Sequence, residues 1–400
     1  VAPRRAPVHP LLARHAASHG LARVQQAADD GRLASLANSS RIFHMTHIAK
    51  TGGRSVRAEL MRLVKPVGGA EQCYPPFMHA SRVNIIFFRE PRAHVLSQYL
   101  HGATVGREKA NAKWLRRKAA GYPMGDGAEG LTGGLARWAA HFARGWSPAR
   151  GDFFSYNPLN MMARTLTCKD EHWNCDFVKT CEVDCAHHMG SGPAGPGAEA
   201  RAAVGAAAGA GAAGAGVAEA ARPPLGLALA AVHTVDVVGV LELMSESLCV
   251  IEFRLKGRIS DECVCPPPAD AAASATAGAA AAAAGSAAGS AAGSAAAAST
   301  RAAVAPGRRM RGRVHVRNPG QRKAPRLQLS ALPAATLRDL DAITAVDAQV
   351  FRSALLRLLC DIGALERATG QQVLCPAKLA KLQAATAHVP GLWPSNATAG

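Results

Sequence analysis

Two long tracts of small residues limit what this chain can fold into. Residues 190–222 are nearly all Ala, Gly and Pro, and residues 266–309 contain the repeat GSAAGSAAGSAAAAST. Such tracts lack the large side chains that build a hydrophobic core, so they indicate flexible insertions or linkers. The foldable remainder is expected at residues 41–189, 223–265 and 310–385, which suffices for one α/β domain of ordinary size.

The chain is therefore predicted to form one domain with a tail at each end. We expect an N-terminal stem or tail over residues 1–40, a single interrupted domain over residues 41–385 and a C-terminal tail over residues 386–400. No signal peptide or strongly apolar membrane-spanning segment is visible. Because the chain begins with Val1 rather than Met, we expect an upstream segment that carries a membrane anchor.

The first strand–loop–helix unit surrounds a loop that is rich in glycine. Residues 41–48 alternate enough to form a strand, and residues 55–64 place apolar side chains at helical spacing. The loop between them reads Lys-Thr-Gly-Gly-Arg over residues 50–54. Small residues at a helix N-terminus leave N–H groups open to an anion, and a lysine adds a full positive charge. This pattern predicts a phosphate site, and an ordinary glycine-containing turn with an incidental lysine is the alternative.

The second unit begins with the apolar run Val83–Phe88, which predicts a buried strand. Arg89, Glu90 and Pro91 follow, and Pro91 suits the first turn of the helix that comes next. Ser97 lies eight residues after Arg89. The alternative is that Arg89 pairs with Glu90 or caps a nearby group, while Ser97 is only a small helix residue.

The order of residues in these two loops is not that of a Walker A motif, in which the lysine follows the glycines. The sequence K-T-G-G-x-S resembles the 5′-phosphosulfate loop of the Golgi carbohydrate sulfotransferases, usually close to H-I-P-K-T-G-G-T-S. Here Ala49 replaces the proline and Arg54 replaces a threonine. The strand, the R-[DE]-P triplet and the serine eight residues on resemble the 3′-phosphate motif of the same family.

Later segments carry weaker similarity to this family. Residues 160–168, NMMARTLTC, resemble a family helix written N-x-Q-x-R-x-L, with Met162 in place of glutamine. Residues 235–255 resemble a late strand and helix, with Gly239, Glu242 and Ser247 at the corresponding places. One amphipathic helix over residues 332–365 is expected to pack on the sheet.

The resemblance implies an α/β fold with a P-loop-like central parallel sheet flanked by helices and interrupted by low-complexity Ala/Gly insertions. It implies transfer of a sulfuryl group from the co-substrate 3′-phosphoadenosine 5′-phosphosulfate (PAPS) to a carbohydrate hydroxyl. The implied acceptor partner is a glycan on a polysaccharide or glycoprotein, and the implied location is the Golgi lumen, as a type II membrane protein. No metal is implied.

The residues implied to bind the donor are Lys50, Thr51, Gly52, Gly53, Arg54, Ser55, Arg89 and Ser97. Lys50 also has an implied catalytic role, because its charge would neutralise the leaving group. The acceptor hydroxyl needs a base, and the candidates between the two motifs are His79 and Glu71. A histidine suits this role near neutral pH.

The charge and the cysteines add two weaker expectations. A net charge of +18 indicates an anionic partner or a solvated basic surface, and without zinc-finger spacing or an RNP-type strand we predict no nucleic-acid partner. Cys168, Cys175, Cys181 and Cys185 lack paired C-x₂-C spacing, so disulfides are preferred to a metal site, and they would indicate an oxidising compartment. A P-loop kinase and a non-catalytic glycan- or nucleotide-binding protein with a degenerate fold are the alternative functions.

Overall fold

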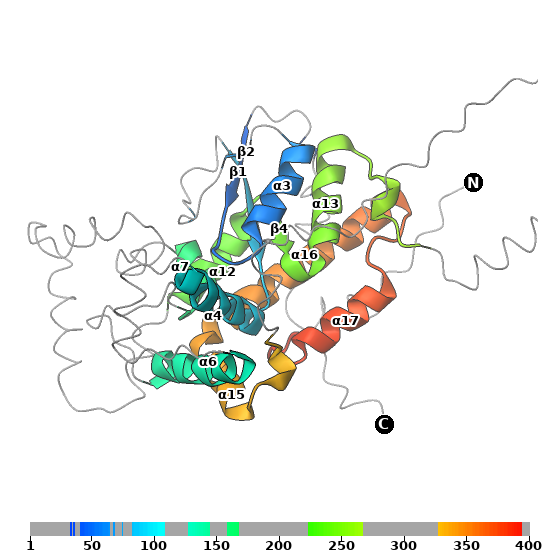
Figure 1. The fold of residues 1–400 in the computed structure, drawn as a ribbon. Helices are drawn as coiled ribbons and strands as arrows, with labels where there is room; N and C mark the ends of the chain where they lie inside the picture. The colour runs from blue at the N-terminus through cyan, green and yellow to red at the C-terminus, as the bar shows by residue number, and fades with distance from the viewer. Residues whose placement is uncertain are drawn as a thin grey trace, which may run out of the picture.

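The computed structural model describes residues 33, 35–36, 41–64, 67–68, 74, 82–108, 127–144, 158–167, 223–266 and 327–393. These residues form a small parallel sheet flanked by helices, which confirms the expected layer arrangement (Figure 1). The Ala/Gly tracts at 190–222 and 266–309 lie outside the described residues, except for Pro266 at the edge of the second.

The sheet contains four strands, and its edge strand β2 is only two residues long. The strands are β1 (Ile42–Thr46), β2 (Val67–Gly68), β3 (Arg82–Phe88) and β4 (Val237–Val240). Their order is β2-β1-β3-β4 and every neighbouring pair is parallel, so each connection must cross over one face of the sheet. The central position of β3 explains why its apolar run shows no polar alternation, since helices cover both of its faces.

Alternate side chains of β3 belong to two different hydrophobic clusters. Val83, Ile85 and Phe87 pack with residues of α3 (Gly53–Leu63) and α13 (Met244–Lys256). Ile86 and Phe88 point to the opposite face and pack with α7 (Met161–Thr167), α12 (Leu225–Thr234) and α16 (Ala345–Thr369). The sheet is therefore the middle layer of a three-layer arrangement (Figure 1).

A third hydrophobic cluster lies beside this sandwich. It joins α4 (Pro91–Glu108), α6 (Gly127–Arg144) and α15 (Ala334–Ile343), with Trp138 buried between Tyr99 and Phe142. The remaining described elements are the 3₁₀ turns η4 (Leu241–Leu243), η5 (Asp261–Cys263) and η7 (Leu329–Ala331), and the helix α17 (Pro376–Thr386). Among the described residues, no helix is both long and apolar enough to cross a membrane.

The single helix expected over residues 332–365 is wrong, because the structure divides it at Thr344 into α15 and α16. A reciprocal capping arrangement with α7 accounts for the break. The Asn160 side-chain oxygen accepts the N–H groups of Val346 and Asp347 at 2.8 and 3.2 Å. The Asp347 carboxylate in turn accepts the N–H groups of Met162 and Ala163 at 3.1 and 2.8 Å. Each helix thus supplies the N-terminal cap of the other, which fixes where α16 begins.

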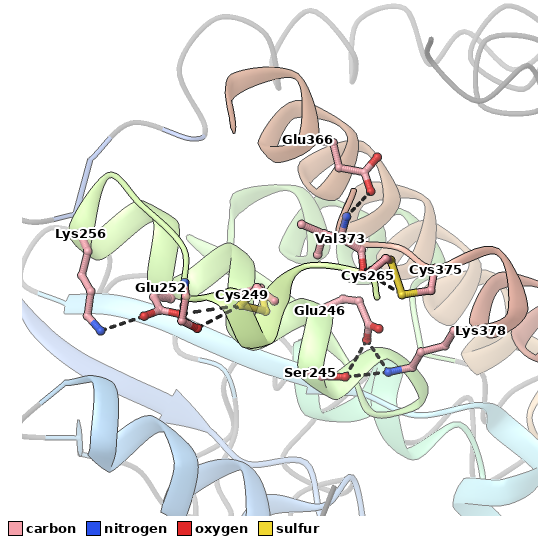
Figure 2. The surroundings of a disulfide bond; sticks show 12 residues. Ser245, Glu246, Cys249, Glu252, Lys256, Cys265, Glu366, Val373, Cys375 and Lys378 are labelled. Carbon is pink, nitrogen blue, oxygen red and sulfur yellow. Dashed lines mark hydrogen bonds and ion pairs between the residues drawn. A yellow bond between two sulfur atoms is a disulfide. The ribbon is translucent and has the colours of Figure 1, made fainter. Parts of the chain in front are cut away.

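Two disulfides join the segment after α13 to the rest of the fold (Figure 2). Cys249 bonds to Cys263, and Cys265 bonds to Cys375 at the start of α17. Disulfides were expected in the group Cys168–Cys185, which lies outside the described residues, so these two pairs are additional ones.

Helix α17 and the residues after it are held against the core at several points. Figure 2 shows the Lys378 ammonium on α17 paired with Glu246 of α13 at 2.6 Å. Val389 and Leu392 are buried, so the packed chain continues past the boundary expected at residue 385.

Candidate functional site

The carboxyl ends of three neighbouring strands bring the two predicted motifs together. Thr46 of β1 is in register with Ile86 of β3, and Phe88 of β3 is in register with Val240 of β4. Because the strands are parallel, the loops that follow them leave the sheet at one edge. That edge is where open α/β sheets bind their ligands. The candidate site therefore consists of residues 47–55, residues 89–97 and η4.

The glycine loop after β1 is a tight turn with two left-handed residues. Lys50 has φ 68° and Gly52 has φ 82°. The Thr51 hydroxyl donates to the Ile48 carbonyl at 2.8 Å, which closes the turn from inside. A non-glycine residue in the left-handed region costs about 1 kcal/mol or more, and such strain is commonly found at functional sites. The cost at Lys50 is offset by the contacts that hold this turn.

Helix α3 begins at this turn without a side-chain cap. Its N-cap is Gly52, which makes no side-chain capping hydrogen bond, and its first turn contains no acidic residue. Arg54 and Arg57 instead lie near this end, exposed to solvent. Positive charges are unfavourable near the positive end of a helix dipole, and an anion bound at this N-terminus would offset them.

Both glycines of the loop are closely approached by other side chains. A Cβ on Gly52 would lie 2.6 Å from Leu241 Cδ1 of η4. A Cβ on Gly53 would overlap three ring atoms of His47. The loop can pack between η4 and the His47 imidazole only because these two positions lack side chains.

The second motif contacts the first through two hydrogen bonds to its backbone. The Arg89 guanidinium donates from Nη1 to the Lys50 carbonyl at 3.0 Å. His94, fully buried on α4, donates from Nε2 to the Ala49 carbonyl at 2.6 Å. Two carbonyls of the loop, those of Ala49 and Lys50, thus accept hydrogen bonds from His94 of α4 and from Arg89, which lies two residues before that helix.

Glu90 has a structural role that accounts for one residue of the R-E-P triplet. Its carboxylate accepts the N–H groups of Arg92 and Ala93 at 2.8 and 2.6 Å, and so it caps α4. The same carboxylate lies 2.9 Å from His388 Nε2, beyond the end of α17. No hydrogen bond between the side chains of Arg89 and Glu90 is found within the described part of the chain. Glu90 caps α4, and Arg89 donates to the nearby Lys50 carbonyl, so the interpretation of Arg89 as a capping residue also agrees with the structure.

The ionisable groups around Arg89 are perturbed by burial. Burial lowers the pKa of the Arg89 guanidinium, and the carboxylates of Glu242 and Glu90 oppose that change. Burial also raises the pKa of Glu242 to about 7, against the attraction of Arg89. Perturbed groups that gather in one place are typical of functional sites.

The two histidines of the site are neutral at physiological pH. The pKa of His47 falls to about 4, first because of burial and then because of the charges on Lys50 and Arg57. The pKa of His94 falls to about 3, mainly because of burial, with further lowering by Arg89 and Lys50. The excess of positive charge at this edge disfavours any further cation, and it favours an anionic ligand.

The structure brings most of the predicted donor residues to this edge. Thr51 is buried in the turn, Arg54 is exposed, and Ser55 and Ser97 are half-buried in the first turn of α3 and the second turn of α4, respectively. The candidate bases Glu71 and His79 lie outside the described residues. Within the described ranges, no three His, Cys, Asp or Glu side chains form a group that would hold a metal ion.

Sequence reasoning assigned no role in the site to His47, His94 or Glu242. The available signal for Glu242 was an acidic residue directly after an apolar strand, on the edge where the other motifs end. Comparison with known proteins adds no further assignment: no family model matches the chain, and the comparisons with curated proteins and with solved structures likewise found no match.

Proposed function

We propose that this chain is a sulfotransferase that moves a sulfuryl group from PAPS to a carbohydrate hydroxyl, on a P-loop-like fold. The observation that carries the proposal is the contact between the two motifs, in which Arg89 donates to the Lys50 carbonyl at the shared edge of β1 and β3. A donor with phosphates at its 5′ and 3′ positions needs two such cationic loops at a fixed separation. The open N-terminus of α3 supports the same interpretation.

Most of the proposed donor residues have a role that follows from their chemistry. The N–H groups of Gly52 and Gly53, with Ser55, would bind the 5′-phosphosulfate at the start of α3. Arg89 and Ser97 would hold the 3′-phosphate and so fix the position of the donor. Charge-assisted hydrogen bonds from arginine and from backbone N–H groups are the strongest contacts available for phosphate.

The transfer is an in-line displacement, so positioning and charge stabilisation dominate its catalysis, as they do in phosphoryl transfer. The acceptor hydroxyl oxygen forms a bond to sulfur while the bond from sulfur to the bridging oxygen breaks. The nucleotide leaves as 3′-phosphoadenosine 5′-phosphate, and Lys50 would neutralise the charge that develops on its bridging oxygen. The hydroxyl proton passes to a base, for which His79 and Glu71 remain the proposed candidates.

The proposed partner is a glycan, and the proposed compartment is the Golgi lumen. The disulfides Cys249–Cys263 and Cys265–Cys375 support a lumenal location, because disulfides persist in oxidising compartments. The basic chain suits an anionic or sulfated polysaccharide, which its positive field would attract.

The proposal is tested by transfer from radiolabelled PAPS to a panel of glycans. Lys50→Ala should lower the transfer rate about 10²–10³-fold, because it removes a charge contact made in the transition state. Arg89→Ala should chiefly raise the KM for PAPS. Lys381→Ala and Arg338→Ala provide matched controls, since both residues are exposed and lie on α17 and α15.

Equal transfer by wild type, Lys50→Ala and Arg89→Ala would contradict the proposed roles. Binding of PAPS without transfer to any glycan would instead favour a non-catalytic nucleotide-binding protein. Thermal stabilisation by ATP with Mg²⁺, but not by 3′-phosphoadenosine 5′-phosphate, would favour a kinase.

A further inference from the structure

Glu242 is the carboxylate whose charge acts most strongly on the proposed phosphate-binding arginine, ahead of Glu90. It lies two residues after the end of β4, in η4, and its Oε1 accepts the N–H of Glu90 at 3.0 Å. Its Oε2 is buried and has no hydrogen-bond partner among the residues that the structure describes. One oxygen of Glu242 therefore supports the loop that carries Arg89, while the other is left without a hydrogen bond in the interior.

The charges around Glu242 come from a small set of groups. Arg89 attracts its carboxylate and Glu90 repels it. Glu90 is itself engaged with the α4 N-terminus and with His388. Glu246, on the adjacent helix α13, is paired with Lys378. Arg89 is thus the cation that favours an ionised Glu242, and the same guanidinium is the proposed ligand of the donor 3′-phosphate.

A phosphate at Arg89 changes this balance. It brings negative charge next to a carboxylate that burial already disfavours, and it competes for the same guanidinium. The raised pKa of Glu242, about 7, means that a proton can be taken up there near neutral pH at little cost. His47 and His94 also lie in the site, but their pKa values of about 4 and 3 keep them neutral over the same range.

We propose that Glu242 is a positioning residue of the donor site, and that its carboxyl takes up one proton when a nucleotide phosphate binds to Arg89. The proposal rests on the proposed function, since it assumes that Arg89 binds a phosphate. In the protonated state Oε1 still accepts the Glu90 N–H, so the loop keeps its support while the repulsion between carboxylate and phosphate is removed. Donor affinity should therefore fall as pH rises above the pKa of Glu242.

The test is calorimetric titration with 3′-phosphoadenosine 5′-phosphate in buffers of different ionisation enthalpy. At about pH 8 the wild type should take up close to one proton per nucleotide bound, and its affinity should fall up to about tenfold per pH unit above about pH 7. Glu242→Gln keeps an oxygen that can accept the Glu90 N–H but has no carboxyl. In this variant the proton uptake on nucleotide binding and the pH dependence of the affinity should therefore disappear. Glu262→Gln, which alters an exposed carboxyl in η5, should behave as wild type.

Different outcomes would overturn the inference about Glu242 and the proposed function on which it rests. Nucleotide binding by the wild type with no proton uptake and constant affinity would overturn the role of Glu242 alone. Equal uptake by wild type and Glu242→Gln would do the same, because the proton would then bind elsewhere. No binding of the nucleotide by the wild type would overturn the inference together with the proposed function. The wild-type measurement decides the proton uptake even if Glu242→Gln fails to fold.

Discussion

The contact between His47 and Gly53 makes a sharp prediction about the glycine loop. A Cβ on Gly53 would lie under 3.0 Å from the ring atoms Nε2, Cδ2 and Cε1 of His47, closer than real Cβ atoms approach their neighbours. Gly53 is buried at the start of α3, and His47 is largely buried directly after β1. Gly53→Ala therefore forces the imidazole or the loop to move.

The expected cost follows from two opposing effects. Alanine at a helical position without a clash would stabilise the fold by up to about 1 kcal/mol, because it restricts the unfolded chain. Overpacking a buried site costs about 1–3 kcal/mol. We expect a net loss of about 1–2 kcal/mol in the free energy of unfolding, measured from urea midpoints at unchanged m-value. The matched control is Gly226→Ala on α12, where an added Cβ meets nothing within 4 Å and no loss is expected.

A double-mutant cycle tests whether His47 is the cause. His47→Ala removes the ring that the new methyl group would meet, so Gly53→Ala should cost about 1 kcal/mol less in that background. If the two changes are additive within about 0.5 kcal/mol, the clash with His47 is not the reason and the argument fails. Titration of each variant with 3′-phosphoadenosine 5′-phosphate would then show whether a displaced loop also weakens binding of the nucleotide.

Two further predictions concern stability. The pKa of His94 lies near 3 instead of 6.5, so between these two pH values His94 is protonated in the unfolded chain but neutral in the folded chain. The free energy of unfolding should therefore fall by up to about 1.4 kcal/mol per pH unit as pH drops from about 6.5 to about 3, and His94→Gln should flatten that part of the curve in urea titrations at each pH. An unchanged slope in His94→Gln would show that other groups determine the pH dependence of the free energy of unfolding. The second concerns the disulfides: Cys375→Ser should cost about 2–5 kcal/mol, and about 2 kcal/mol more than Cys263→Ser, because its bridge spans 110 residues rather than 14. Equal losses in thermal or urea unfolding would contradict this loop-entropy account.

The elements of the fold that sequence predicted well are those with a strong local pattern. The strand before the glycine loop, the apolar strand Val83–Phe88 and the late strand–helix pair all appear close to their expected places. The break at Thr344 was not predictable, because the apolar spacing continues through it. Its cause is a cap supplied by Asn160, far away in the chain, and no local window contains that information.

The residues of the candidate site fall into the same two groups: those predictable from the local sequence and those that depend on distant parts of the chain. Lys50, Gly52 and Arg89 were identified from residue types next to strand ends, which is a local property. Glu242 and His94 act through partners that the sheet order brings to them. The pattern around His94 gave no sign of its role, and the signal for Glu242 was only its place after an apolar strand.

The sequence by itself determined that two glycine- or proline-marked turns follow apolar strands, because strand, turn and helix preferences depend on neighbouring residues. Only the tertiary structure decided that β1, β3 and β4 lie side by side, since pairing of distant strands depends on packing across the whole core. That adjacency places Glu242 beside the Arg89 loop and His94 against the Ala49 carbonyl, and burial there sets their pKa values. The charges of this edge are therefore a property of the fold rather than of either motif alone.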